Sequence, residues 1–137
     1  MRTVEVSRFV RAKPPEVARA LDPVSIVEYE GSFDVFDIEE RPDDTLVVAG
    51  GSGLRLTLRF EEREDGYFYE QEDAEGQPLE TMETTLTYRP QDEGTRVTAA
   101  STVSMGLRPA ILTDRLAAWK RKGELSRGLD SLAEAVE

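Results

Sequence analysis

Three polar side chains occupy strand positions whose neighbours two residues away are apolar: Arg8, Thr84 and Ser101. A polar group buried without a partner costs about 1–3 kcal/mol, so each of these side chains needs an explanation. They either orient the polar end of a bound molecule, with Arg8 pairing a carboxylate through its planar guanidinium, or they are structural. In the structural alternative Arg8 lies at a sheet edge or pairs with a glutamate, and the hydroxyls bond within the sheet.

Other residue types restrict the chemistry further. The chain has no histidine and no cysteine, so it lacks the commonest general base and any thiolate. The acidic runs at 61–65 and 70–73 do not have the spacing of a calcium-binding loop and indicate a solvated face. The glycine-rich run at 50–53 lacks the Lys-Ser/Thr of a phosphate-binding loop and indicates a hairpin tip. We therefore expect no metal, no cofactor and no catalytic motif.

The composition indicates one acidic domain. The 137 residues carry 28 acidic and 17 basic side chains, a net charge of −11, and 39% are hydrophobic. The acidic excess predicts a halophilic source and argues against nucleic-acid binding, which requires the opposite charge. No apolar run approaches the roughly 20 residues that span a membrane, and the charged, alternating start does not resemble a signal peptide. We expect a soluble cytoplasmic protein.

The elements that must position these residues follow from apolar periodicity. A period of two predicts seven strands, joined mostly by tight turns such as Asp65-Gly66, and so an antiparallel sheet. Pro14-Pro15 predicts a short helix that continues to Leu21 and is broken at Asp22-Pro23. Residues 24–29 are expected to form a second short helix or a turn, which gives two short helices between the first and second strands. The expected strands span 2–10, 32–41, 45–50, 54–62, 67–72, 81–88 and 95–105.

Residues 109–137 have the pattern of one long amphipathic helix with two apolar stripes. Leu112, Leu116 and Trp119 share one face, and a second stripe that begins at Leu125 is rotated away from it. The change falls near Gly123, which predicts a kink there.

Three segments resemble one superfamily. "VEVSRFVRAKPPEVARAL" resembles its first strand and proline-led helix, "TRVTAASTVSMG" its last strand, and "LTDRLAAWKRKGELSRGLDSLAEAVE" its closing helix. With the order of elements, the chain resembles the SRPBCC superfamily of START-like lipid carriers, birch-pollen-allergen-like proteins and polyketide cyclase/dehydrase-like proteins. The resemblance implies one α+β helix-grip domain over 1–137, in which a seven-stranded curved antiparallel sheet wraps the C-terminal helix. The superfamily shares no catalytic signature, so no functional residue transfers.

The resemblance also implies a cavity between sheet and helix that takes an apolar or amphipathic molecule of lipid, polyketide or isoprenoid type. Positions that face the predicted cavity are either its lining or simply core. The candidate ligand-binding residues are Arg8, Leu56, Leu58, Met82, Thr84, Tyr88, Ser101, Met105, Leu116 and Trp119.

Two other functions stay open. The relatively basic ends of the chain could dock an acidic partner or a second copy, which makes a regulatory module or a homodimer an alternative. A cyclase/dehydratase-like enzyme is the third hypothesis, and it would need acids or bases such as Tyr88, Arg8 and Asp37 in the cavity.

Overall fold

The computed structural model describes residues 1–51, 53–75, 81–105 and 110–137. The elements run β1 (Arg2–Val10), α1 (Pro14–Ala20), α2 (Pro23–Glu30), β2 (Asp34–Glu40), β3 (Thr45–Gly51), β4 (Leu54–Arg63), β5 (Gly66–Glu75), β6 (Thr81–Gln91), β7 (Gly94–Ser104) and α3 (Ala110–Val136). The predicted hairpin tip at 50–53 includes residue 52, and the predicted helix start includes residue 109. Both of these residues lie outside the described ranges.

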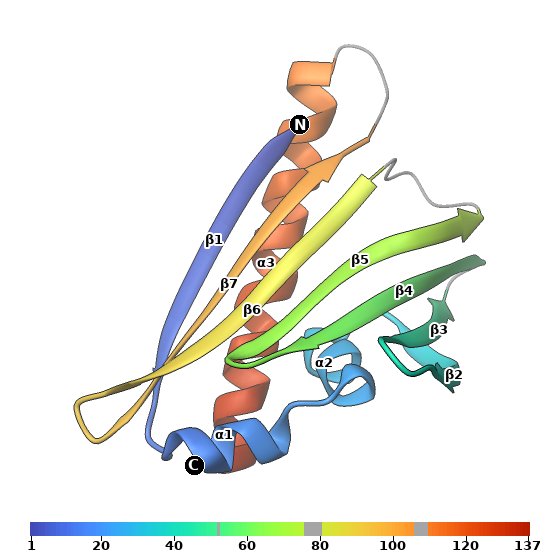
Figure 1. The fold of residues 1–137 in the computed structure, drawn as a ribbon. Coiled ribbons are helices and arrows are strands. Elements are labelled where there is room, and N and C mark those ends of the chain that lie inside the picture. The colour runs from blue at the N-terminus through green and yellow to red at the C-terminus, as the bar shows by residue number, and fades with distance from the viewer. Residues whose placement is uncertain (52, 76–80, 106–109) are drawn as a thin grey trace.

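The seven strands form one antiparallel sheet in the order β1-β7-β6-β5-β4-β3-β2. Consecutive strands from β2 to β7 are hairpin neighbours, and β1 closes the far edge by pairing with β7. The strands fan around α3, which runs along the sheet, while α1 and α2 lie at its lower end (Figure 1). The predicted helix-grip architecture is confirmed, including the two short helices between the first and second strands.

The β4–β5 turn requires its glycine. Gly66 has φ +152°, and a Cβ there would lie 1.8 Å from the carbonyl oxygen of Leu86 on β6. The preceding residue is held as well, because Asp65 O accepts a hydrogen bond from the backbone N–H of Tyr88 at 2.9 Å. The absence of a side chain at 66 therefore lets β6 pack directly against the turn.

The two apolar stripes of α3 lie in different surroundings. Leu125, Leu129 and Leu132 are buried in the core against the sheet, whereas Leu112 and Leu116 are exposed. The helix is continuous through Gly123 from Ala110 to Val136. The rotation of the apolar stripe predicted a kink. In the structure the rotation coincides with a change in the surroundings of these side chains, from solvent in the first half of the helix to the core in the second. Within the described residues, α3 makes most of its close backbone contacts with β1, β7, α1 and α2.

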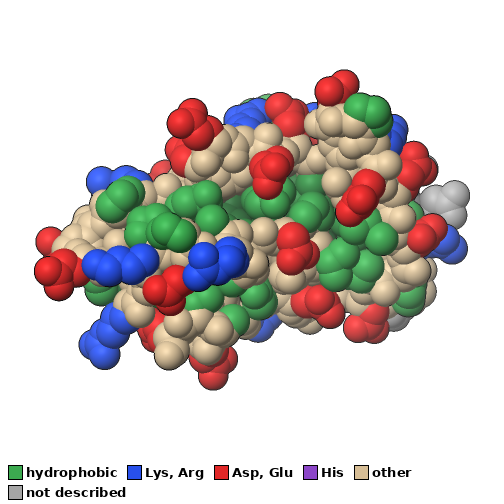
Figure 2. Space-filling model, turned by 60° about the horizontal axis from the view of Figure 1, so that its bottom comes forward, with side chains coloured by type: hydrophobic (Ala, Val, Ile, Leu, Met, Phe, Trp, Pro, Cys, Tyr) green, Lys and Arg blue, Asp and Glu red, His purple; other side chains and the backbone are tan. Residues whose placement is uncertain are grey.

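The surface is charged and mixed. Figure 2 shows acidic and basic side chains over one face, with apolar side chains gathered in patches between them. Among the described helices, none combines the length and the apolar character needed to cross a membrane.

The turn at Gly66 yields a prediction about stability. Gly66→Ala should lower the free energy of unfolding by about 1–3 kcal/mol, because the new methyl group overlaps the backbone of β6. Urea denaturation measures the change, with Gly51→Ala as the control, since a Cβ at 51 meets nothing within 4 Å. Equal stability of the two variants would contradict this explanation of the turn.

Candidate functional site

A cavity of about 240 Å³ lies between β4, β5, α2 and the first half of α3. Its wall is mostly apolar: Leu56 and Leu58 come from β4, Met82 from β6, and Leu116 and Ala117 from α3. The polar side chains of the lining come from the end of α2 and the residues that follow it, from β5 and from α3. They are Glu30, Ser32, Tyr69, Gln71, Thr113, Lys120, Arg121 and Glu124.

One wall of the cavity lies where the described pairing between strands β5 and β6 ends. The described pairing between β5 and β6 runs from Gly66↔Thr87 to Glu70↔Glu83, and the next residues, Gln71 and Met82, both line the cavity. Figure 1 shows β5 and β6 diverging beyond this point. Beyond Glu70, the described part of β5 keeps its pairing with β4.

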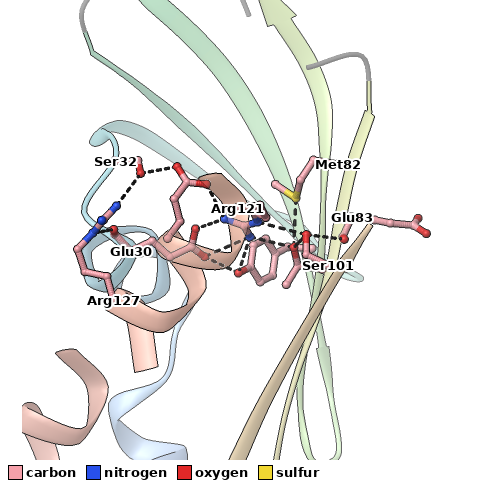
Figure 3. A network of polar contacts seen from close by, with 10 residues as sticks. Glu30, Ser32, Met82, Glu83, Ser101, Arg121 and Arg127 are labelled. Atoms are coloured by element: carbon pink, nitrogen blue, oxygen red, sulfur yellow. Dashed lines mark hydrogen bonds and ion pairs between the residues drawn. The ribbon is translucent and has the colours of Figure 1, made fainter. Parts of the chain in front are cut away.

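The buried end of the cavity is built around Arg121, whose side chain is only 4% exposed (Figure 3). An arginine offers five N–H donors, and here each group has an acceptor. Nε donates to Ser101 Oγ at 3.2 Å. The two Nη atoms donate to four side chains: Glu30, Glu124 Oε1 (3.3 Å), Tyr69 Oη (3.1 Å) and Thr84 Oγ1 (2.9 Å).

The other hydroxyls of this network are also engaged. Tyr69 Oη donates to Glu30 Oε2, and Ser32 Oγ donates to Glu124 Oε2. Ser101 Oγ donates to the backbone carbonyl of Glu83 at 3.1 Å. The network thus joins α2, α3 and three strands, and its donors are turned toward protein acceptors (Figure 3).

The sequence positions Glu30 by ending a helix at that residue. Glu30 is the last residue of α2, and Gly31 ends the helix in the left-handed conformation at φ +76°. The terminal carbonyl of Glu30 accepts a hydrogen bond from Arg127 Nε at 2.6 Å. A Cβ at Gly128 would lie 3.2 Å from Glu30 Cγ, so the glycine lets α2 approach α3 closely.

The electrostatics fix the charge states of two groups. Burial by itself would lower the pKa of Arg121, but the neighbouring Glu30 carboxylate outweighs it and the pKa is raised, so the guanidinium stays charged. Burial, together with Glu30, raises the pKa of Tyr69 well above its ordinary value, so the phenol stays neutral. The Tyr69 ring stacks on Phe60 with centroids 4.6 Å apart, and the guanidinium carbon of Arg121 lies 5.8 Å from its centre.

No family model matches the sequence, and no curated protein is similar to it at a significant level. Solved structures do match over nearly the whole chain. The protein TTHA0849 of Thermus thermophilus is 21% identical with a TM-score of 0.75, covering 98% of this chain and 97% of its own. XoxI of Bacillus cereus is 17% identical with a TM-score of 0.75, covering 99% and 96%.

A START superfamily protein of Mycobacterium smegmatis has a TM-score of 0.72 at 13% identity, covering 98% of this chain and 99% of its own. The chain has a START-like fold. The expected resemblance to START-like proteins is confirmed at the level of the fold, and the cavity lies between sheet and C-terminal helix, where the START-like resemblance implied it.

Five of the ten predicted site residues line this cavity: Leu56, Leu58, Met82, Met105 and Leu116. Two more, Thr84 and Ser101, are buried behind it and accept hydrogen bonds from Arg121. The structural alternative expected these hydroxyls to bond within the sheet. Thr84 Oγ1 does donate to Ser101 Oγ at 2.8 Å, but both hydroxyls also have a partner outside the sheet, Arg121 of α3.

The other three predicted residues are not among those lining the cavity. Arg8 pairs with Asp130 of α3 at 2.5 Å, outside the cavity, and its Nε has no partner. Tyr88 is half-buried on β6. Trp119 is 77% exposed on α3 and borders a shallow depression formed by that helix, so the structure places it outside the cavity.

Sequence reasoning missed the central residue, Arg121. It lies in the run Lys120-Arg121-Lys122, which is typical of a solvated helix face. The sequence nevertheless indicated its direction, because Arg121 lies four residues from Ala117 and four from Leu125, on one face of the helix. All three side chains are buried in the structure. Two inward-facing hydroxyls directly opposite on neighbouring strands, Thr84 and Ser101, were a second signal that a polar partner comes from elsewhere.

Removal of Arg121 should be strongly destabilising. Arg121→Met leaves Glu30 and Glu124 without their shared cation and should lower the free energy of unfolding by about 3–5 kcal/mol. Chemical denaturation measures this against Arg115→Met, an exposed arginine of the same helix. Adding Glu30→Gln to Arg121→Met should restore part of the loss, and a loss below about 1 kcal/mol would show that the network is not structural.

Alkaline pH should unfold the protein in a defined range. Burial and the neighbouring Glu62 raise the pKa of Tyr67 to about 12, and the pKa of Tyr69 is raised as well. Since both folded values exceed the unfolded value near 10, the stabilisation is complete below pH 10 and is lost as pH rises toward the folded values. The phenolate absorbance of Tyr67 and Tyr69 should therefore appear together with the loss of helical circular dichroism, and Tyr67→Phe should weaken the pH dependence of stability between pH 10 and 12. Ionisation of all four tyrosines in a folded protein would contradict this.

Proposed function

We propose that this protein binds or carries an amphipathic small molecule in the cavity between β4, β5, α2 and α3. The observation that carries the proposal is a mostly apolar cavity of about 240 Å³ that ends in buried polar side chains. Apolar walls with a few fixed polar groups are the usual design of a small-molecule site. A lipid, polyketide or isoprenoid fragment is the ligand class that such walls suit, and the START-like fold supports the same interpretation.

The size of the cavity restricts the ligand. Drug-sized ligands occupy pockets of roughly 300–1,000 Å³, so 240 Å³ holds a smaller molecule or part of a longer one. Leu116 lines the cavity and is also 65% exposed, which places it at the rim. A longer ligand would therefore extend past Leu116 toward solvent.

The site supports binding better than catalysis. A general acid or base works best with a pKa near the working pH, and the pKa values of Tyr69 and Arg121 are moved away from neutrality. The acid–base candidates of the enzyme hypothesis, Arg8, Asp37 and Tyr88, do not line the cavity. The observed geometry thus supplies walls and fixed polar groups.

A second candidate is an interaction module, and one observation favours it. Leu112, Leu116 and Trp119 form an exposed apolar stripe on α3, flanked by Arg115 and Lys120. The remainder of the protein is strongly acidic, so a second copy of the chain is a chemically suitable occupant for this stripe. A halophilic source stays a prediction from composition alone.

Filling the cavity tests the binding proposal. Ala117→Phe adds a ring to a buried lining position and should weaken binding of any cavity ligand by about tenfold or more, while Ala135→Phe, exposed on the same helix, should not. Calorimetry with a panel of apolar ligands, in dilute buffer and in molar potassium chloride, measures the affinities.

Two results would contradict the proposal. One is the absence of saturable binding by the folded protein to every member of the panel, which would favour the interaction module. The other is binding that Ala117→Phe leaves unchanged, which would place the ligand outside this cavity.

A further inference from the structure

The donors at the buried end of the cavity are already occupied. All N–H groups of Arg121 have protein acceptors, and the hydroxyls of Tyr69 and Ser32 donate to carboxylates. Gln71 and Thr113, further along the wall, have interactions of their own. A ligand anion could bind Arg121 only by displacing a carboxylate or a hydroxyl that the fold supplies.

The acceptors are not exhausted. An ionised carboxylate offers about four lone-pair sites. Glu124 accepts one hydrogen bond from Arg121 and one from Ser32. Glu30 accepts from Arg121 through both side-chain oxygens and from Tyr69 through one. Both side chains line the cavity, so a hydrogen-bond donor on a ligand there would lie near carboxylates whose acceptor sites are not all used.

The net charge at the buried end of the cavity favours the same kind of ligand group as the unused hydrogen-bond acceptors do. At the buried end, two carboxylates share one guanidinium, which leaves an excess of one negative charge. The remaining cation of the lining, Lys120, is exposed on α3. Because water screens an exposed charge more than a buried one, Lys120 cannot cancel the negative excess inside.

We propose that the cavity selects amphipathic molecules whose polar end donates hydrogen bonds, an ammonium or a hydroxyl group, and binds that end next to Glu124 and Glu30. This inference rests on the proposed function and specifies its ligand class. The cavity, the saturated guanidinium and the unequal charge are three separate observations with the same consequence. A carboxylate or phosphate of equal size is disfavoured inside, and could be accommodated only at the rim near Lys120, with its tail inward.

A matched series of ligands tests the inference. Octylamine, octanol and octanoate have the same apolar chain and differ in the polar end. Calorimetry at neutral pH should give the tightest binding for octylamine and the next for octanol. Octanoate should be weaker than octylamine by about tenfold or more, the effect of a hydrogen bond to a charged group.

Variants identify the group responsible. Glu124→Gln should remove most of the preference for octylamine over octanol, and Glu134→Gln, the same charge change at an exposed position of α3, should keep it. If Glu124→Gln does not fold, the order of affinities of the three ligands for the unaltered protein still tests the inference about the polar end.

Each remaining outcome separates the two proposals. Tightest binding by octanoate, lost in Lys120→Gln, would overturn the inference about the polar end and leave ligand binding in the cavity intact. Equal affinity for all three would also overturn it. Saturable binding of none of them, nor of any ligand in the wider panel, would remove the proposed function itself.

Discussion

The arrangement of this domain depends on keeping one guanidinium buried. A charged group can be buried only if neighbouring groups supply partners for its hydrogen bonds and an opposite charge. Arg121 meets that requirement by drawing Glu30 from α2, Tyr69 from β5, and Thr84 and Ser101 from the centre of the sheet around itself. Helix α3, helix α2 and the sheet are thereby joined around Arg121. The cavity is the space that remains on one side of this contact.

The architecture was predictable from the sequence because it follows from patterns that repeat along the chain. Alternation identified all seven strands, and the prolines at Pro14-Pro15 and Asp22-Pro23 marked the region of the two short helices. The cavity walls were partly predictable for the same reason, as Leu56 and Met82 show. Their inward direction is a property of strand periodicity.

The polar centre was not predictable, because it is made by contacts between distant segments. Glu30 and Arg121 are separated by 91 residues. The spacing of Arg121 with Ala117 and Leu125 indicates the face of the helix on which it lies, but not that a carboxylate of α2 lies opposite it. The exposed position of Trp119 differs from the expected one for another reason. Its spacing matched an apolar face, but periodicity does not say whether a face meets the sheet or the solvent.

The two sides of the cavity differ in how firmly they are held. On one side, Arg127 and Arg121 of α3 donate hydrogen bonds to the main-chain carbonyl and to the carboxylate of Glu30, which ties the end of α2 to α3. On the other, the described β5–β6 pairing ends at Glu70↔Glu83, whereas β6 and β7 stay paired from Thr81↔Ser104 to Gln91↔Gly94. Local opening takes least energy where the fewest interactions must break. Among the described residues, the β5–β6 side of the cavity is therefore the side where the fewest sheet hydrogen bonds resist local opening, and the side formed by α2 and α3 is the more firmly held.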